Sequence, residues 1–263
     1  MLHDAKPKIE APKVSIITAV YNGARTIENC ILSVQKQTYS SLEHIIIDGG
    51  STDGTLGIIE RYRKHISYWV SEPDGGIGDA MNKGIREAKG EYILFIHSDD
   101  RLADKFSLEK AMSLIHESID IAMFSIIYGV NKRKLYPNKY DPMINFKLPS
   151  SHQGMICKRS LFEKYGEFDT SYRICMDYEI LLRWVRQNVS IMKSNFILAY
   201  MGDQGISSKV DKLEQEKRFS EERRAHFEHS PSIFTDLFYY LYWFAYPLYR
   251  NVKYLFTKFR EKH

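Results

Sequence analysis

The chain has 263 residues and carries 37 Lys or Arg residues against 33 Asp or Glu residues, a net charge of +4. Five basic residues and a single Glu fall within residues 250–263, so the rest of the chain is electrically balanced and offers no basic face for nucleic acid. A hydrophobic fraction of 44% and a charged fraction of 27% exclude a disordered chain and indicate a globular one.

Residues 1–12 are polar, contain two prolines and lack the apolar run of a secretory signal. We therefore expect a flexible leader on a protein of the cytoplasm. The three cysteines, Cys30, Cys157 and Cys175, are odd in number and lie far apart. They predict neither a disulfide framework nor a zinc site, which agrees with a reducing compartment.

The first hundred residues alternate between strand and helix patterns. Residues 14–20 are β-branched and nearly continuously apolar, as in a strand buried on both faces, and residues 24–37 show apolar side chains at helical spacing. This alternation is typical of an α/β fold with a doubly wound, mostly parallel sheet and helices on both faces. The same pattern predicts strands at 44–48, 67–71 and 92–96 and helices at 52–64 and about 79–88.

Beyond residue 105 the alternation is looser. The patterns predict a helix at 106–117, a long strand at 121–130, a hairpin and loop at 131–142, an amphipathic helix at 177–187 and a strand at about 190–200. We assign residues 13–206 to one main domain. Residues 207–230 are highly charged and predict a solvated helical linker.

The tail at 231–263 is rich in aromatic residues, since twelve of the 35 in the chain lie within residues 233–259. It contains Asp236 and Pro247 and has no run of eighteen uncharged apolar residues, which disfavours a membrane-spanning helix. Tyr and Trp prefer the headgroup level, and flanking Lys and Arg suit an anionic leaflet. We expect an amphipathic helix, or a broken helix pair, lying on the membrane surface. The alternative is an aromatic helix packed on the body or on a partner subunit.

Polar side chains cluster where three of the predicted strands end. Because the carboxyl ends of parallel strands share one edge of a sheet, the clusters predict a single crevice. Asp99 and Asp100 follow a hydrophobic strand, and paired carboxylates suit a hard divalent cation such as Mn²⁺ or Mg²⁺. The alternative is helix capping, which both Asp100 and Asp53 could provide. The clusters are residues 18–22, 48–54 and 97–100.

Two common nucleotide-binding motifs are absent from the sequence. Residues 21–25 follow the first strand without a G-x-G-x-x-G pattern, and no G-x-x-x-x-G-K-[ST] loop occurs. A dinucleotide-dependent oxidoreductase and a P-loop enzyme are therefore disfavoured.

Four sequence blocks together resemble the family 2 glycosyltransferases, in the family's order and over about residues 13–205. The resemblance implies an inverting enzyme of the GT-A fold that takes its sugar from a nucleotide-activated donor. The blocks are KVSIITAVYNG (13–23), IIIDGGSTDGT (45–55), DAMNKGIREAKGEYILFIHSDD (79–100) and DYEILLRW (177–184).

The resemblance also implies which residues contact the donor. Thr18, Tyr21 and Asp48 match the positions that hold the nucleoside, with Asp48 reading the edge of the base. Asp79 and Asn82 lie in the block that faces the donor.

Further matches concern the metal and the catalytic base. Asp99 matches the last aspartate of the D-x-D motif, which ligates the metal on the donor diphosphate, and Asp177 matches the carboxylate that acts as the base. The first D-x-D aspartate is His97 here, so the metal would rest mainly on Asp99, and His97 and Ser98 would contact the donor. The sequence also departs from the family at Gly49, which removes a carboxylate from the donor pocket.

His152 precedes a glutamine where close relatives often carry a His-Gln pair, which implies contact with donor or acceptor phosphates; a structural histidine is the alternative. The resemblance implies metal-assisted transfer from a nucleoside diphosphate sugar, with uridine as the expected nucleoside, to a lipid-linked or polysaccharide acceptor. The setting would be bacterial surface polysaccharide assembly at the inner face of the plasma membrane. The alternatives are a nucleotidyltransferase on a related α/β fold, which residues 21–25 fit poorly, and a non-catalytic membrane-bound scaffold.

Overall fold

The structure is a computed structural model that describes residues 13–138, 144–203 and 212–260. The leader predicted at 1–12 and part of the loop predicted at 131–142 lie outside these residues. The strands are β1 (Val14–Val20), β2 (Leu42–Asp48), β3 (Tyr68–Ser71), β4 (Tyr92–Phe95), β5 (Arg101–Leu102), β6 (Ile121–Tyr128), β7 (Arg133–Leu135), β8 (Met155–Lys158) and β9 (Ile191–Met201). The helices are α1 (Ile27–Gln35), α2 (Thr55–Arg61), α3 (Ile77–Glu87), α4 (Ser107–Leu114), α5 (Arg159–Tyr165), α6 (Met176–Val185), α7 (Lys212–Glu228) and α8 (Ile233–Arg260), with 3-10 turns at Arg63–His65 and His152–Gly154.

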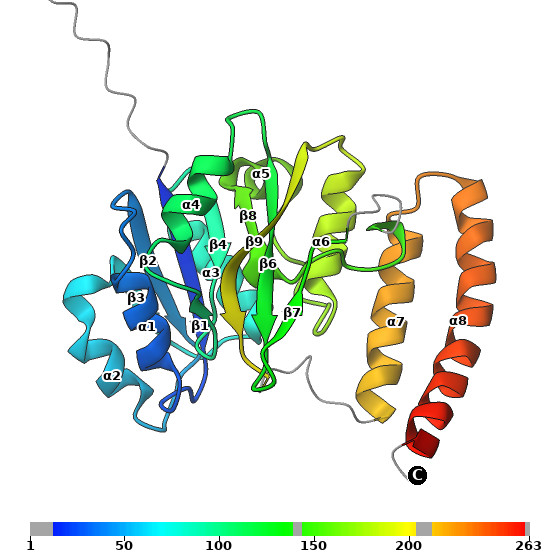
Figure 1. The fold of residues 1–263 in the computed structure, drawn as a ribbon, viewed down its shortest axis with the longest axis horizontal. Coiled ribbons are helices and arrows are strands. Elements are labelled where there is room, and N and C mark those ends of the chain that lie inside the picture. The colour runs from blue at the N-terminus through cyan, green and yellow to red at the C-terminus, as the bar shows by residue number, and fades with distance from the viewer. Residues whose placement is uncertain (1–12, 139–143, 204–211, 261–263) are drawn as a thin grey trace, which may run out of the picture.

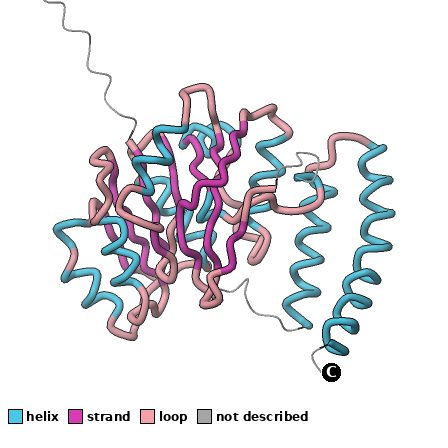
Figure 2. Tube along the Cα trace, viewed as in Figure 1, coloured by secondary structure: helices cyan, strands magenta, loops and turns pink. Residues whose placement is uncertain are grey.

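Within the described residues, nine strands form one sheet in the order β3-β2-β1-β4-β8-β6-β9-β5, with β7 paired to β6 (Figures 1 and 2). β3, β2, β1 and β4 are parallel, and β6 is parallel to β9. β8 runs antiparallel to both β4 and β6, so those two strands point the same way. The carboxyl ends of β1, β4, β6 and β9 therefore lie along one edge of the sheet, and the predicted α/β class is confirmed.

The sequence pattern missed β5, β8 and α5. β8 has four residues and runs directly into α5 at Arg159, without a turn residue between them. A short apolar run of this kind cannot be divided into strand and helix by periodicity alone. β5 has only two residues, too few for any pattern.

Apolar side chains fill both faces of the sheet. α3, α5 and α6 pack on one face, and α1, α2 and α4 pack on the other. β1 contributes to the cores on both faces: Ile17 and Ala19 pack on the side of α3, α5 and α6, and Ile16 and Val20 pack on the side of α1, α2 and α4. The continuous apolar run that predicted a strand buried on both faces is confirmed by this arrangement.

α7 and α8 form an antiparallel helical hairpin beside α6 (Figure 1). The predicted linker forms α7, but it is not solvated on all sides, because Ala225 and His226 are buried. α8 is one helix that continues through Pro247, so a broken helix pair is not formed. Tyr239 and Trp243 of α8 are buried against the body. No helix in the described part of the chain is long and apolar enough to cross a membrane.

Candidate active site

A cavity of about 680 Å³ opens at the edge of the sheet where β1, β4, β6 and β9 end. The turns after β1 and β4, the ends of β6 and β9, and the first turns of α3 and α6 form its walls. Its volume is that of a small-molecule site, and its position is where α/β sheets bind ligands. The predicted site residues that line it are Tyr21, His97, Ser98, Asp99, His152 and Asp177.

The turn after β4 carries two carboxylates in different surroundings. Asp100 is buried and accepts hydrogen bonds from the backbone N–H groups of His97 (3.1 Å) and Gly202 (2.9 Å) and from the side-chain amide of Gln153 (3.0 Å). Burial, and then the charge of Asp99, raises the pKa of Asp100 to about 6. Asp99 is half-buried at the cavity wall, and burial raises its pKa too. Asp100 therefore braces the turn, whereas Asp99 is the carboxylate that a ligand can reach.

His97 is a neutral hydrogen-bond donor in this site. Its Nδ1 accepts a hydrogen bond from the backbone N–H of Ala19 (3.4 Å), which places the ring proton on Nε2. Burial, and then the nearby His152, lowers the pKa of His97 well below its usual range. Its Nε2 is buried without a hydrogen-bond partner among the described residues. With the proton on that nitrogen, the ring presents a hydrogen-bond donor on the side away from Ala19.

His152 links the turn after β4 to α6. Its ring lies edge-on to the ring of His97, with the centroids 4.8 Å apart, and its Nδ1 lies 3.5 Å from Oδ2 of Asp177. Asp177 is the second residue of α6, and its Oδ1 accepts a hydrogen bond from the backbone N–H of Tyr178 (2.8 Å). Asp99 and Asp177 therefore line one cavity, and the contacting rings of His97 and His152 connect the turn after β4 to α6.

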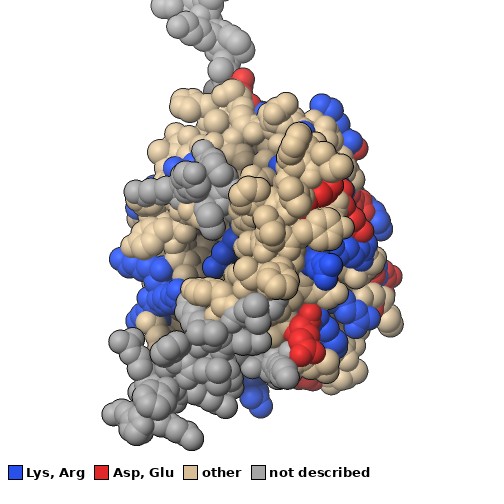
Figure 3. Space-filling view, turned by 90° about the vertical axis from the view of Figure 1, so that its right-hand side faces the viewer, with Lys and Arg blue, Asp and Glu red and all other residues tan. Residues whose placement is uncertain are grey.

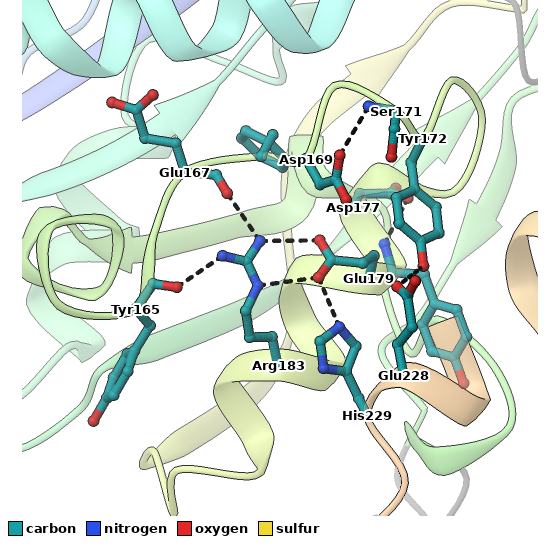
Figure 4. A network of polar contacts seen from close by, with 12 residues as sticks. Tyr165, Glu167, Asp169, Ser171, Tyr172, Asp177, Glu179, Arg183, Glu228 and His229 are labelled. Atoms are coloured by element: carbon teal, nitrogen blue, oxygen red, sulfur yellow. Dashed lines mark hydrogen bonds and ion pairs between the residues drawn. The ribbon is translucent and has the colours of Figure 1, made fainter. Parts of the chain in front are cut away.

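A buried ionic network holds α6 in place (Figure 4). Arg183 donates to both carboxylate oxygens of Glu179, each at 3.0 Å, and to the carbonyls of Tyr165 (2.7 Å) and Glu167 (2.8 Å). Nε2 of His229, which follows α7, lies 2.7 Å from the Glu179 carboxylate. The helix that carries Asp177 is thus fixed both to the loop before it and to the end of α7.

Thr18 does not line the cavity. The residue is fully buried in β1, where its hydroxyl donates to the carbonyl of Ile96 (2.6 Å) and lies 2.9 Å from Nε2 of His44. Its side chain ties β1 to its two neighbours in the sheet. Val20, two residues further along β1, lines the cavity instead.

Asn82 and Asp79 also lie outside the cavity lining. The buried amide of Asn82 donates to the carbonyl of Phe168 (2.8 Å) and accepts from its N–H (2.9 Å). Asn82 therefore links α3 to the loop before α6. Asp79 accepts a hydrogen bond from the N–H of Gly75 (3.0 Å) and lies 3.6 Å from Nζ of Lys83, so it shapes the turn that begins α3.

Asp48 is buried at the end of β2, and the cavity walls do not include it. Its Oδ2 accepts hydrogen bonds from the N–H groups of Gly50 (3.1 Å) and Ser51 (2.9 Å) and from the hydroxyl of Ser71 (2.7 Å). Its Oδ1 is buried without a hydrogen-bond partner among the described residues. One oxygen thus organises the loop after β2, and the other has unused capacity to accept a hydrogen bond.

Arg173, Arg218 and Glu222 line the cavity, although the sequence reasoning did not assign them. Arg218 and Glu222 belong to α7 and pair with each other at 3.0 Å. A helix with charges on every side gives no sign of which charges face a site, so only the fold could identify them. Gly202 is a further missed position, because a Cβ there would lie 2.6 Å from Oδ2 of Asp99.

No group of three or more His, Cys, Asp or Glu side chains forms a metal site among the described residues. Asp99 nevertheless fits one cation that takes its other ligands from a bound phosphate and water, the usual arrangement for Mg²⁺. The oxygens of Asp100 already accept three hydrogen bonds from the protein, which leaves Asp99 as the available carboxylate.

These features define an α/β enzyme of the GT-A type, with its site beyond the carboxyl ends of a mostly parallel sheet. Residues 15–175 match the model of the glycosyl transferase family 2. The chain belongs to this family and is a glycosyltransferase.

Two mycobacterial relatives support this assignment. An uncharacterised glycosyltransferase of Mycobacterium tuberculosis is 33% identical over 180 residues, which cover 66% of this chain and 69% of that protein. The PGL/p-HBAD biosynthesis glycosyltransferase of Mycobacterium bovis is 31% identical over 179 residues, which cover 66% and 70%.

Solved structures confirm the fold. TarS of S. aureus superposes with a TM-score of 0.64 at 24% identity, over 81% of this chain and 39% of the TarS chain. The mannosyltransferase PcManGT of Pyrobaculum calidifontis gives a TM-score of 0.63 at 19% identity, over 84% of this chain and 64% of that one.

Proposed function

We propose that this enzyme transfers a sugar from a nucleoside diphosphate sugar, with uridine as the nucleoside, to a hydroxyl of a lipid-linked or saccharide acceptor. The observation that carries the proposal is the single cavity that Asp99 and Asp177 both line. Asp99 can hold a cation that neutralises the charged leaving group, and Asp177 can accept the proton of the acceptor hydroxyl. Sugar transfer requires both functions in one site.

Asp177 is the general base in this proposal. The acceptor oxygen forms a bond to the anomeric carbon as the bond from that carbon to the diphosphate oxygen breaks. The acceptor proton passes to the carboxylate of Asp177, and the electron pair of the broken bond leaves with the diphosphate. A single displacement of this kind inverts the anomeric configuration. Oδ2 of Asp177 lies 3.5 Å from Nδ1 of His152, so the histidine stands beside the base in this proposal.

Asp99 would hold Mn²⁺ or Mg²⁺ together with oxygens of the donor diphosphate. The cation, when bound, supplies electrostatic stabilisation of the departing diphosphate. The Nε2–H of His97 has no protein acceptor among the described residues, which suits a donor phosphate or ribose oxygen. Ser98 lines the same wall of the cavity and is assigned to the donor with it.

Several features support a uridine donor. Oδ1 of Asp48 is an unused acceptor, as an N–H group on the edge of a base requires. Tyr21 lies at the cavity with 66% of its surface exposed, so its ring is open to a nucleoside. The solved structures of TarS include complexes with UDP and with UDP-GlcNAc. The structure of PcManGT contains GDP-Man and Mn²⁺, which supports a metal but leaves the choice of base to experiment.

We further propose that α8 holds the enzyme on the inner face of the plasma membrane, where it would serve surface glycan assembly. Between residues 233 and 249, one side of α8 packs against the body and apolar and aromatic side chains on its other sides are exposed. Figure 3 shows an uncharged expanse on this end of the molecule, with Lys and Arg residues on one side of it and both acidic and basic residues on the other. An exposed apolar patch of this kind marks an interaction site, and its aromatic rings suit the headgroup level of a bilayer. The exposed residues are Ile233, Phe234, Leu237, Phe238, Tyr240, Leu241, Phe244 and Tyr249.

The donor and metal roles are tested by calorimetry with UDP in the presence of Mn²⁺ and by release of UDP from UDP-sugars. Asp99→Ala should weaken UDP binding at least 10-fold in Mn²⁺, because the cation loses its protein carboxylate. Asp177→Asn should bind UDP as the wild type does but lose at least 100-fold in turnover. Glu60→Gln, which neutralises an exposed carboxylate of α2 paired with Arg63, is the control and should resemble the wild type. Normal turnover in Asp177→Asn would exclude this residue as the base.

The membrane role is tested by sedimentation with vesicles that contain anionic phosphatidylglycerol. Phe234→Ser/Phe244→Ser removes two exposed rings, and it should lower the bound fraction several-fold without changing UDP binding. Val130→Ser removes an apolar side chain that is 82% exposed elsewhere on the surface, and it should bind vesicles normally. Equal binding of all three proteins would exclude α8 as the membrane contact.

A further inference from the structure

α7 is attached to the segment that precedes Asp177 by more than apolar packing. Arg224 donates hydrogen bonds to Asp169 (3.3 Å) and to Ser171 (2.9 Å). The hydroxyl of Tyr172 donates to the carboxylate of Glu228 (2.6 Å). α7, which the sequence predicts to be a linker, is therefore hydrogen-bonded to the loop that leads into α6.

Glu221 contacts the backbone of the segment directly before α6. Its carboxylate accepts hydrogen bonds from three consecutive backbone N–H groups, those of Arg173 (3.0 Å), Ile174 (2.8 Å) and Cys175 (2.9 Å). These residues are 46 to 48 positions away in the sequence. Hydrogen bonds from backbone N–H groups to an ionised carboxylate are about twice as strong as those between neutral groups.

Cys175 is the N-cap residue of α6, but its side chain makes no capping hydrogen bond. Its thiol lies 3.7 Å from the carbonyl of Arg218, and its own carbonyl accepts from the N–H groups of Tyr178 (3.0 Å) and Glu179 (2.9 Å). The residue is thus held on one side by the first turn of α6 and on the other by Glu221. Helix starts need acceptors for such N–H groups, and here a distant helix supplies one.

This geometry matters for catalysis because Asp177 lies only two residues after Cys175. Any shift or rotation of residues 173–175 moves the first turn of α6, and with it the carboxylate that faces His152 at 3.5 Å. A catalytic group that is displaced by about 1 Å can lose about 100-fold in rate. Neighbouring residues of α7, Arg218 and Glu222, line the same cavity, so α7 is part of the site and not only of its support.

We propose that Glu221 is a positioning residue for the general base: its carboxylate fixes residues 173–175 and so sets where Asp177 meets the acceptor. The proposal rests on the proposed function, since it takes Asp177 as the base. It assigns the C-terminal helical hairpin a part in the chemistry in addition to any part in membrane attachment.

The test compares Glu221→Gln with Glu228→Gln in the full-length enzyme. Glutamine keeps the size of the side chain, but its NH₂ group cannot accept a hydrogen bond from a backbone N–H group. Glu228 is the matched control, because it bonds the side chain of Tyr172 in the same loop and not the backbone at the start of α6. The measurements are UDP affinity in Mn²⁺ by calorimetry, the thermal midpoint, and kcat and KM for release of UDP from UDP-GlcNAc, with water in place of the acceptor hydroxyl.

Glu221→Gln should lower kcat at least 10-fold while KM and UDP affinity stay within about twofold of the wild type, and Glu228→Gln should retain most of kcat. In a protein that already carries Asp177→Asn, adding Glu221→Gln should lower kcat almost no further, because a positioning residue acts through the base that it positions. An unchanged kcat, an equal loss in Glu228→Gln, or an undiminished loss in the Asp177→Asn background would each overturn the proposal. If the wild type released UDP from no UDP-sugar, the failure would lie with the proposed function and not with Glu221.

Discussion

Replacing Arg183 by methionine tests how the helix that carries Asp177 is held. Methionine preserves much of the length and apolar bulk of arginine but removes the two bonds to Glu179 and the two bonds to backbone carbonyls. The Glu179 side chain is only 4% exposed, so its carboxylate would be left buried with His229 as its remaining partner.

Removing one partner of a buried ion pair costs about 3–5 kcal/mol. The lower end applies here, about 3 kcal/mol, because the Arg183 side chain keeps 22% exposure to solvent. In a domain of this size each kcal/mol shifts the thermal midpoint by about 2–4 °C, so we expect a fall of about 6–12 °C. The assay is thermal unfolding followed by far-UV circular dichroism.

The molecule provides a matched control in Arg86, which makes the same two-pronged contact with Glu167 on the surface. The Arg86 side chain is 59% exposed, so Arg86→Met should cost at most about 1 kcal/mol. Arg183→Met/Glu179→Met should be more stable than Arg183→Met alone, because no unpaired charge is then buried. Equal midpoints for Arg183→Met and Arg86→Met would refute the reasoning.

Three further predictions follow from single contacts. Gly202→Ala should lower UDP affinity in Mn²⁺ with little effect in its absence, because the new Cβ would lie 2.6 Å from Oδ2 of Asp99; calorimetry checks this. Gly84→Ala should destabilise the fold by about 1–3 kcal/mol in urea unfolding, since its Cβ would overlap a methyl group of Ile17 in the core. Burial, and then a nearby arginine, lowers the pKa of His226 to about 4. The unfolded chain therefore binds more protons between pH 6.5 and 4, and acidification through that window should destabilise the α7–α8 hairpin by up to about 3 kcal/mol. Hydrogen exchange should show this loss at pH 5, and His226→Gln should flatten it.

The sequence predicts the α/β core well, because its strands are buried on both faces and carry an unambiguous apolar run. Residues 14–20 are predicted as a strand and form β1 with the same bounds. The rule that parallel strands end at one edge brings Tyr21 and the turn at 97–100 to the same cavity, as expected. Asp177 required the family resemblance, since a carboxylate at the start of a helix is equally typical of a cap.

Other residues could not be placed from the sequence, for definite physical reasons. Which residues of β1 line the cavity depends on where the strand leaves the sheet, and the strand pattern does not fix that point. Gln153 and Gly202 brace Asp100 from 53 and 102 residues away, and no local signal records such contacts. α7 has charges on nearly every side, so its periodicity cannot show that Glu221 faces the body.

The contacts of α7 also bear on where the functional unit ends. A boundary at residue 206 would remove Glu221 and leave the N–H groups of residues 173–175 without their acceptor. The dependence extends to α8, since Nε1 of Trp243 donates to Nδ1 of His226 (2.9 Å), and Nε2 of His226 lies 2.8 Å from the hydroxyl of Tyr178. Tyr178 is the residue after Asp177, so this buried chain of contacts runs from α8 to the proposed base. We therefore infer that the catalytic unit includes both helices, and that a protein truncated after α7 would lose the rings of Tyr239 and Trp243 that cover His226 and would expose this histidine to water beside the active site.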